Sequence, residues 1–266
     1  MVVIPRPRAR APLTNWRRDN LPPTYCSTRP CTAGRLLAPS ILLPSQQSQR
    51  ESIIHRILTP LPRVLPIEFR GPATQALRGL IFGAGDRWVV LVHAEGQDLD
   101  AWRPLAHLLA DHELRVLAFD LPGHGASDAE WNPELAAPAV MAAVDFARSG
   151  GARQVHLIGA EVGALAVLAA AARDQYQPDS IVALSPIIDD RVASLADVRD
   201  ARAPKLILVG SLDPGAVGSA EAFYRGAIGH CELTQLPVSA EGTDLLSGEW
   251  GSHAREKVLA HLMHEG

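Results

Sequence analysis

Glu161 is the first candidate for chemistry in this chain, because it lies at the centre of Gly159-Ala160-Glu161-Val162-Gly163. An apolar run typical of a buried strand, 155–158, precedes this segment, and a small-residue run typical of a helix, 164–172, follows it. A sharp turn between the two would present Glu161 at the carboxyl end of a strand, where α/β sheets bind their ligands. A carboxylate there can accept a proton or bind a cation. The alternative is a glutamate that only points to solvent.

Apolar strands alternate with helices on both sides of this turn, from about residue 65 onward. Strands are predicted at 65–69, 77–82, 88–92, 115–119, 154–158, 181–184, 205–209 and 232–236. Helices are predicted at 102–110, 134–149, 164–172, 219–227 and 253–264. This alternation predicts a three-layer α/β domain with a mostly parallel, doubly wound sheet. The short link 186–204 leaves no room for a substantial lid domain, so we expect a shallow, open pocket.

Four segments of this domain carry a specific pattern. They are 91–96 (Leu-Val-His-Ala-Glu-Gly), 119–127 (Phe-Asp-Leu-Pro-Gly-His-Gly-Ala-Ser), the turn around Glu161, and 208–214 (Leu-Val-Gly-Ser-Leu-Asp-Pro). Together they resemble the α/β-hydrolase superfamily, in a small form without a large cap domain. The resemblance covers residues 65–266 and implies that fold. It also implies an oxyanion hole built from backbone N–H groups of Ala94, Glu95 and Val162, with His93 and His124 beside the pocket.

The catalytic residues of this superfamily follow the order nucleophile, acid, histidine. By resemblance, Glu161 takes the place of the nucleophile in G-x-S-x-G and Asp213 takes the place of the acid. Glu241, in the loop after the last predicted strand, stands where the histidine is expected. Two of the three catalytic positions are therefore glutamate, which predicts a degenerate triad at an otherwise recognisable nucleophile elbow.

An ionised Glu161 is a poor nucleophile toward an ester, and no histidine remains to activate water. We expect its carboxylate to fold into the oxyanion hole, where free N–H groups at a helix start favour an anion. Hydrogen bonds there favour the ionised form, whereas Asp213 and Glu241 oppose it, so the three groups could titrate together and share a proton.

Other residues support weaker hypotheses about the site. Glu161, Asp213 and Glu241 could form an all-oxygen Mg²⁺ or Ca²⁺ site, but nothing in their spacing is diagnostic. Ser127 and Ser211 could replace the missing nucleophile, although neither has a base at a predictable distance. We expect His93 and His124 to orient backbone rather than to contact substrate.

Residues 1–64 form a distinct, basic leader rich in proline and arginine, which we expect to be disordered. Residues 1–65 hold ten arginines, no lysine and two acids, a balance of +8 in a chain whose net charge is −4. The leader could contact an acidic partner or membrane, act as a targeting peptide, or reflect a misassigned start codon. Nucleic acid is an unfavoured partner because no binding motif accompanies the basic residues.

The composition is typical of a globular protein without membrane-spanning segments. The 266 residues are 47% hydrophobic with a mean hydropathy of +0.04, enough for a sizeable core. No apolar run is long enough for a transmembrane segment, and three widely spaced cysteines favour a reducing, cytoplasmic setting. We expect no cofactor and no metal, and the oligomeric state stays open. The favoured hypothesis is a pseudoenzyme that binds a small ligand or acts as a regulator. The alternative is a hydrolase of a small ester or related carbonyl compound that uses carboxylate-activated water.

Overall fold

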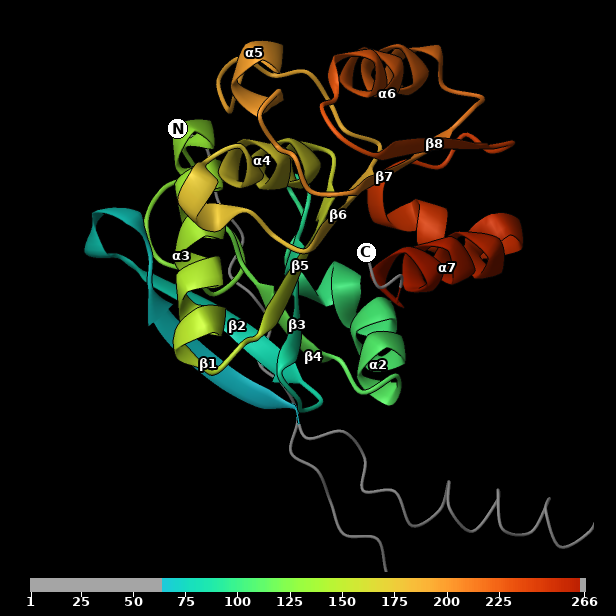
Figure 1. Ribbon diagram of the computed structural model, residues 1–266. Helices are drawn as coiled ribbons and strands as arrows, with labels where there is room; N and C mark the ends of the chain where they lie inside the picture. Colours follow the sequence, from blue (N-terminus) through green and yellow to red (C-terminus); the bar gives the residue numbers. More distant parts are fainter. Residues whose placement is uncertain (1–63, 264–266) are drawn as a thin grey trace, which may run out of the picture. The chain divides into compact units, whose positions relative to one another are not determined.

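The computed structural model describes residues 64–263, and its centre is an eight-stranded sheet of order β1-β2-β4-β3-β5-β6-β7-β8 (Figure 1). The strands are β1 (Leu65–Arg70), β2 (Ala76–Phe82), β3 (Arg87–Val92), β4 (Arg115–Phe119), β5 (Gln154–Ala160), β6 (Ser180–Leu184), β7 (Lys205–Gly210) and β8 (Cys231–Leu236). Only β2 runs against its neighbours, and the other pairs from β4 to β8 are parallel. The predicted α/β class with a mostly parallel sheet is confirmed.

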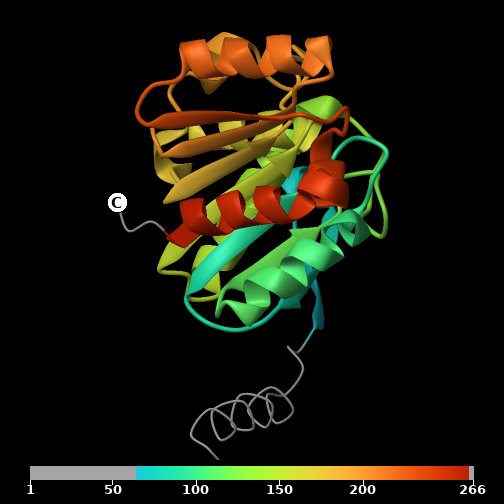
Figure 2. The ribbon, with the colours of Figure 1, turned by 90° about the vertical axis from the view of Figure 1, so that its right-hand side faces the viewer.

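Helices cover both faces of the sheet (Figures 1 and 2). One face packs against α2 (Arg103–Asp111) and α7 (Gly248–Met263), through side chains such as Leu105 and Val258. The other face packs against α3 (Ala136–Ser149), α4 (Val162–Ala171), α5 (Leu195–Val198) and α6 (Pro214–Gly226). All ten residues of α4 are buried, which explains why its sequence is apolar and small on every side.

Each of the predicted strands and helices lies where a strand or helix is observed, with differences at the ends. α6 begins at Pro214, about a turn before the predicted start, because the side chain of Asp213 caps its first N–H groups and Pro214 suits the first helical position. α7 begins at Gly248 rather than at 253. Between β6 and β7 the only helix among the described residues is the four-residue α5, which agrees with the absence of a large cap.

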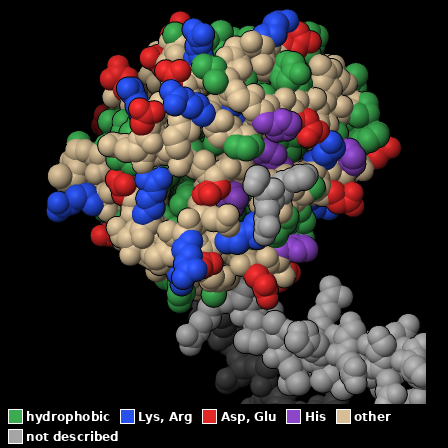
Figure 3. Space-filling model, viewed as in Figure 1, with side chains coloured by type: hydrophobic (Ala, Val, Ile, Leu, Met, Phe, Trp, Pro, Cys, Tyr) green, Lys and Arg blue, Asp and Glu red, His purple; other side chains and the backbone are tan. Residues whose placement is uncertain are grey.

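Three further findings concern the leader, the helices and the surface charge. The basic leader, including Cys26 and Cys31, lies outside the described residues. Within residues 64–263, no helix combines the length and apolar character that crossing a bilayer requires. Acidic and basic side chains intermingle over the face in Figure 3, without an extended basic patch there.

His156 on β5 makes the fold sensitive to acid. It is 3% exposed, its Nδ1 lies 2.8 Å from Ser180 Oγ, and burial lowers its pKa to about 4. Because the unfolded chain binds a proton near pH 6.5 and the folded chain does not, the free energy of unfolding should fall as the pH drops from about 6.5 to about 4. The contribution of this one group is about 3 kcal/mol.

His156→Gln should remove that part of the acid dependence, measured by urea unfolding across this pH range. His112→Gln, at an exposed position after α2, is the matched control and should keep the wild-type slope. Equal slopes for His156→Gln and wild type would contradict the assignment.

Candidate functional site

The turn between β5 and α4 has the geometry of a sharp elbow. Glu161 has φ 50° and ψ −110°, a left-handed backbone conformation that side-chain-bearing residues rarely adopt. Its N–H donates to Leu184 O (2.9 Å) on β6, and its C=O accepts from Leu165 N (3.1 Å) in α4. A methyl group on Gly159 would collide with the carbonyl of Gly163, so close packing of strand and helix explains both flanking glycines.

The carboxyl group of Glu161 is half-buried and lies against the loop after β8. A Cβ on Gly242 would be 2.5 Å from Glu161 Oε1, so the loop passes close to this carboxyl group, and the positive φ of Gly242 (50°) favours glycine there. Burial, and then the nearby charge of Asp244, raise the pKa of Glu161. The side chain makes no capping hydrogen bond to α4, so the structure differs from the expectation that such hydrogen bonds favour the ionised form. Desolvation governs this group instead.

Asp213 and Glu241 form a hydrogen-bonded pair of carboxyl groups. Their mutual hydrogen bond lowers the pKa of Asp213 and raises the pKa of Glu241, which burial and the charges of Asp213 and Glu161 raise further. Asp213 Oδ1 also accepts from Gly215 N (2.8 Å) and Ala216 N (3.2 Å) at the start of α6, which favours its ionised form. The two pKa values are therefore shifted in opposite directions, so Asp213 ionises before Glu241 as the pH rises.

The structure thus brings together the three residues predicted from the sequence, Glu161, Asp213 and Glu241. The ionisable groups that perturb them are one another and Asp244, and within residues 64–263 no histidine is among them. Among the same residues, no group of three or more His, Cys, Asp or Glu side chains is arranged to hold a metal ion. The cluster is therefore an arrangement of acids without an imidazole partner.

His93 and His124 each tie two loops together. Leu121 N–H donates to His93 Nε2 (2.9 Å), while His93 Nδ1 lies 2.8 Å from Ala94 O and so carries the proton. Gly96 N–H donates to His124 Nε2 (3.2 Å), and His124 Nδ1 faces Pro122 O (3.2 Å). Burial lowers the pKa of His93, which keeps the ring neutral as this bonding requires. Both rings join the loop after β3 to the loop after β4.

The predicted oxyanion-hole residues Ala94, Glu95 and Val162 lie at the end of β3 and the start of α4. The two segments touch, because a Cβ on Gly163 would collide with the carbonyl groups of Val92 and His93. The side chain of Glu95 accepts from Trp131 Nε1 (2.7 Å) and lies 3.8 Å from Arg191 Nη2.

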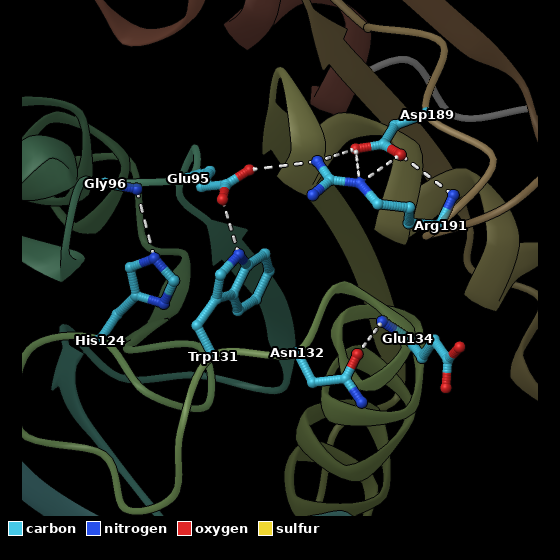
Figure 4. A network of polar contacts seen from close by, with 8 residues as sticks. All are labelled: Glu95, Gly96, His124, Trp131, Asn132, Glu134, Asp189 and Arg191. Carbon is cyan, nitrogen blue, oxygen red and sulfur yellow. Dashed lines mark hydrogen bonds and ion pairs between the residues drawn. The ribbon is translucent and has the colours of Figure 1, made fainter.

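Trp131, Arg191 and Asp189 were not predicted from the sequence, since they come from loops remote from Glu95. Arg191 pairs with Asp189 (2.7 Å), so three loops are linked through Glu95 across the rim of the site (Figure 4). The sequence indicates these residues only by their positions: Trp131 lies in the loop after β4, and Asp189 and Arg191 lie in the loop after β6.

The two candidate replacement serines have other roles. Ser127 Oγ donates to Asp120 O (2.7 Å) and accepts from Arg78 N (2.9 Å), so it braces its loop. Ser211 begins the turn after β7, where its N–H donates to Leu236 O (2.7 Å).

Ser185 is a site residue that sequence reasoning missed. It follows β6 directly, next to the Leu184 carbonyl that binds the Glu161 N–H. Its φ is 45°, it is 1% exposed, and its hydroxyl has no partner among the described residues. The sequence could have suggested Ser185, because it directly follows a predicted buried strand, as Glu161 does.

Comparison with known proteins agrees with this architecture. The family model described as the alpha/beta hydrolase fold matches residues 87–215. The chain has the α/β-hydrolase fold. No curated protein matches the sequence.

Solved structures with the same fold include several hydrolases. The esterase Pf2001 of Pyrococcus furiosus superposes with a TM-score of 0.66 at 18% identity, over 76% of this chain and 90% of that one. The enol-lactonase of Burkholderia xenovorans gives 0.62 at 16% identity, over 74% and 100%. The dienelactone hydrolase of Anabaena variabilis gives 0.65 at 18% identity, over 77% and 99%. At these identities the likeness concerns the fold.

Glu161→Gln should stabilise the protein at neutral pH. The pKa of Glu161 is higher in the folded chain than in the unfolded chain, so the ionised carboxylate lowers the free energy of unfolding at pH values above the raised pKa. This destabilisation disappears as the pH falls below the raised pKa and the group becomes protonated. The melting temperature of Glu161→Gln should therefore exceed that of wild type at pH 7 and approach it at acid pH. Glu256→Gln, on the exposed side of α7, should change neither value. A destabilised Glu161→Gln at pH 7 would show that the carboxylate is well solvated or hydrogen-bonded.

Ser185→Ala should be neutral or stabilising in thermal unfolding, because it removes a buried hydroxyl that has no partner. Ser127→Ala is the contrasting variant and should lose about 1–3 kcal/mol, since it leaves the Arg78 N–H without its acceptor. Equal destabilisation of the two variants would mean that the Ser185 hydroxyl is hydrogen-bonded in solution.

Proposed function

We propose that this α/β-hydrolase-fold protein does not carry out ordinary serine hydrolysis and instead binds a small ligand at the former catalytic crevice, as a binding or regulatory protein. One observation carries the proposal: at the elbow Glu161 lies near two neighbouring carboxyl groups, those of Asp213 and Glu241, and among the described residues no imidazole joins them. Acyl transfer on this fold needs a hydroxyl nucleophile and a base that takes and returns its proton. In this crevice the groups at those positions are acids, which suit hydrogen bonding to a ligand better than attack on a carbonyl.

A second candidate follows from the raised pKa values of Glu161 and Glu241. A carboxylate whose pKa is raised is a stronger general base than an ordinary one. Such a base could activate water toward a small ester or related carbonyl compound, the kind of chemistry named for the esterase and lactonase structures of the same fold. Proton abstraction from water by Glu161 or Glu241 would replace the missing serine step.

A labelling experiment separates the two candidates. Wild-type protein should not react with a fluorophosphonate probe, and under the first proposal it should not hydrolyse p-nitrophenyl acetate. Hydrolysis without labelling, lost in Glu241→Gln or Glu161→Gln, would favour the second candidate. Labelling of the wild type would reveal a reactive serine and overturn both.

The double substitution Glu161→Ser with Glu241→His tests whether the crevice keeps its hydrolase geometry. Because residue 241 already hydrogen-bonds to Asp213 and residue 161 sits at the elbow, we expect the double variant to gain labelling and esterase turnover. Glu161→Ser alone lacks the base and should gain little, which makes it the matched control.

A further inference from the structure

A pocket of about 370 Å³ opens beside the carboxyl cluster. Its lining includes residues of α2 and α7, the two helices that cover one face of the sheet (Figure 2). Its polar lining comes from Gln97 and Asp98 after β3, from Thr243 and Asp244 after β8, and from Arg255 on α7. The rest of the wall is largely apolar and includes Leu105 of α2. This volume lies at the lower end of the range for small-molecule sites, about 300–1,000 Å³.

Arg255 offers this pocket an unpaired guanidinium group. Its Nη1 donates to Leu246 O and its Nη2 to Ser252 Oγ (3.1 Å), which leaves three of the five N–H groups of an arginine without a protein partner. Within residues 64–263, no carboxylate forms a salt bridge with it. A forked, fixed guanidinium of this kind recognises a carboxylate.

Asp244 offers the opposite charge. Its backbone bonds to Glu241 and Ser247, but its carboxylate has neither a hydrogen bond nor a salt bridge among the described residues. Asp98 adds a second carboxylate, of which Oδ1 is taken by Asp100 N (2.9 Å). Unpaired carboxylates at a pocket wall favour a protonated amine.

We propose that this pocket binds an amino-acid-sized zwitterion, with its carboxylate on Arg255, its ammonium on Asp244 and an apolar side chain against the wall formed with Leu105. The apolar wall favours a ligand such as leucine over a purely polar one. The proposal rests on the proposed ligand-binding role and names the class of ligand. It also connects the pocket to the elbow, because the charge of Asp244 acts on Glu161. An ammonium group bound at Asp244 would offset the repulsion between the two acids.

Isothermal titration calorimetry of the full chain with four probes tests the inference. L-Leucine and L-alanyl-L-leucine carry both charges at two different separations, 4-methylpentanoate carries only the carboxylate, and leucinamide carries only the amine. At least one zwitterion should bind at least about tenfold more tightly than both single-charge probes, because each charge-assisted hydrogen bond to the ligand contributes about that factor. Comparable binding of either single-charge probe, or no zwitterion binding up to about 10 mM, overturns the proposal.

Variants locate the two contacts. Asp244→Asn removes a negative charge that pairs with no group among the described residues. It should weaken binding of the zwitterion about tenfold and leave binding of 4-methylpentanoate unchanged. Arg255→Gln should weaken both, and Arg255→Lys should recover part of the loss; thermal melts identify any folding defect. Arg225→Gln, on α6, is the control and should bind as wild type does.

Unaltered zwitterion binding in Asp244→Asn overturns the inference even if Arg255→Gln misfolds. The labelling and esterase assays do not depend on this pocket, so failure of the zwitterion proposal is distinguishable from failure of the proposed function.

Discussion

The left-handed turn at Glu161 is the constraint on which the site depends. A residue with a side chain at positive φ costs on the order of 1–3 kcal/mol, so the surrounding structure must hold it in place. Close packing holds the turn in place: Gly159 lets β5 approach α4, Gly163 lets the end of β3 approach α4, and the Leu184 carbonyl accepts from the Glu161 N–H. These interactions involve backbone and glycine only. The turn therefore forms whatever side chain it presents, and a glutamate can occupy it without altering the fold.

Three acids in one crevice set the electrostatics that any ligand would meet. The N–H groups at the start of α6 stabilise charge on Asp213, and the neighbouring Asp213 raises the pKa of Glu241. Glu161 is half-buried and lies near Asp244, so its charge is opposed both by desolvation and by repulsion. A crevice with this balance favours neutral or cationic groups. The crevice of an active hydrolase has the opposite electrostatic preference, because its hydrogen-bond donors stabilise the negative charge that develops on the substrate.

The sequence was sufficient to predict most of the fold and to nominate Glu161, Asp213 and Glu241 as candidate site residues. Strands such as β3 and β5 are continuous apolar runs, and the glycines around Glu161 mark the elbow directly. Contacts between loops were not predictable, because they depend on side chains brought together by the topology. The Trp131–Glu95–Arg191 link joins three such loops, and the orphaned hydroxyl of Ser185 appears only when β5 and β6 lie side by side. The expected hydrogen bonds to Glu161 were absent for a similar reason: its side chain lies toward Gly242 rather than over the first turn of α4.

The crevice keeps its shape through side chains other than the three acids. Asp120 is 2% exposed, and its two oxygens accept from Leu99 N (2.8 Å) and Ala126 N (2.8 Å), so it anchors the segments after β3 and β4. His93 and His124 connect the same two loops by neutral hydrogen bonds. Since each of these groups acts on backbone, the loops do not rely on Glu161 or Glu241 for their positions. The residues that set the chemistry of the crevice are therefore different from those that set its shape. Glu161, Asp213 and Glu241 determine its charge, whereas Asp120, His93, His124 and the packed glycines hold its loops in place.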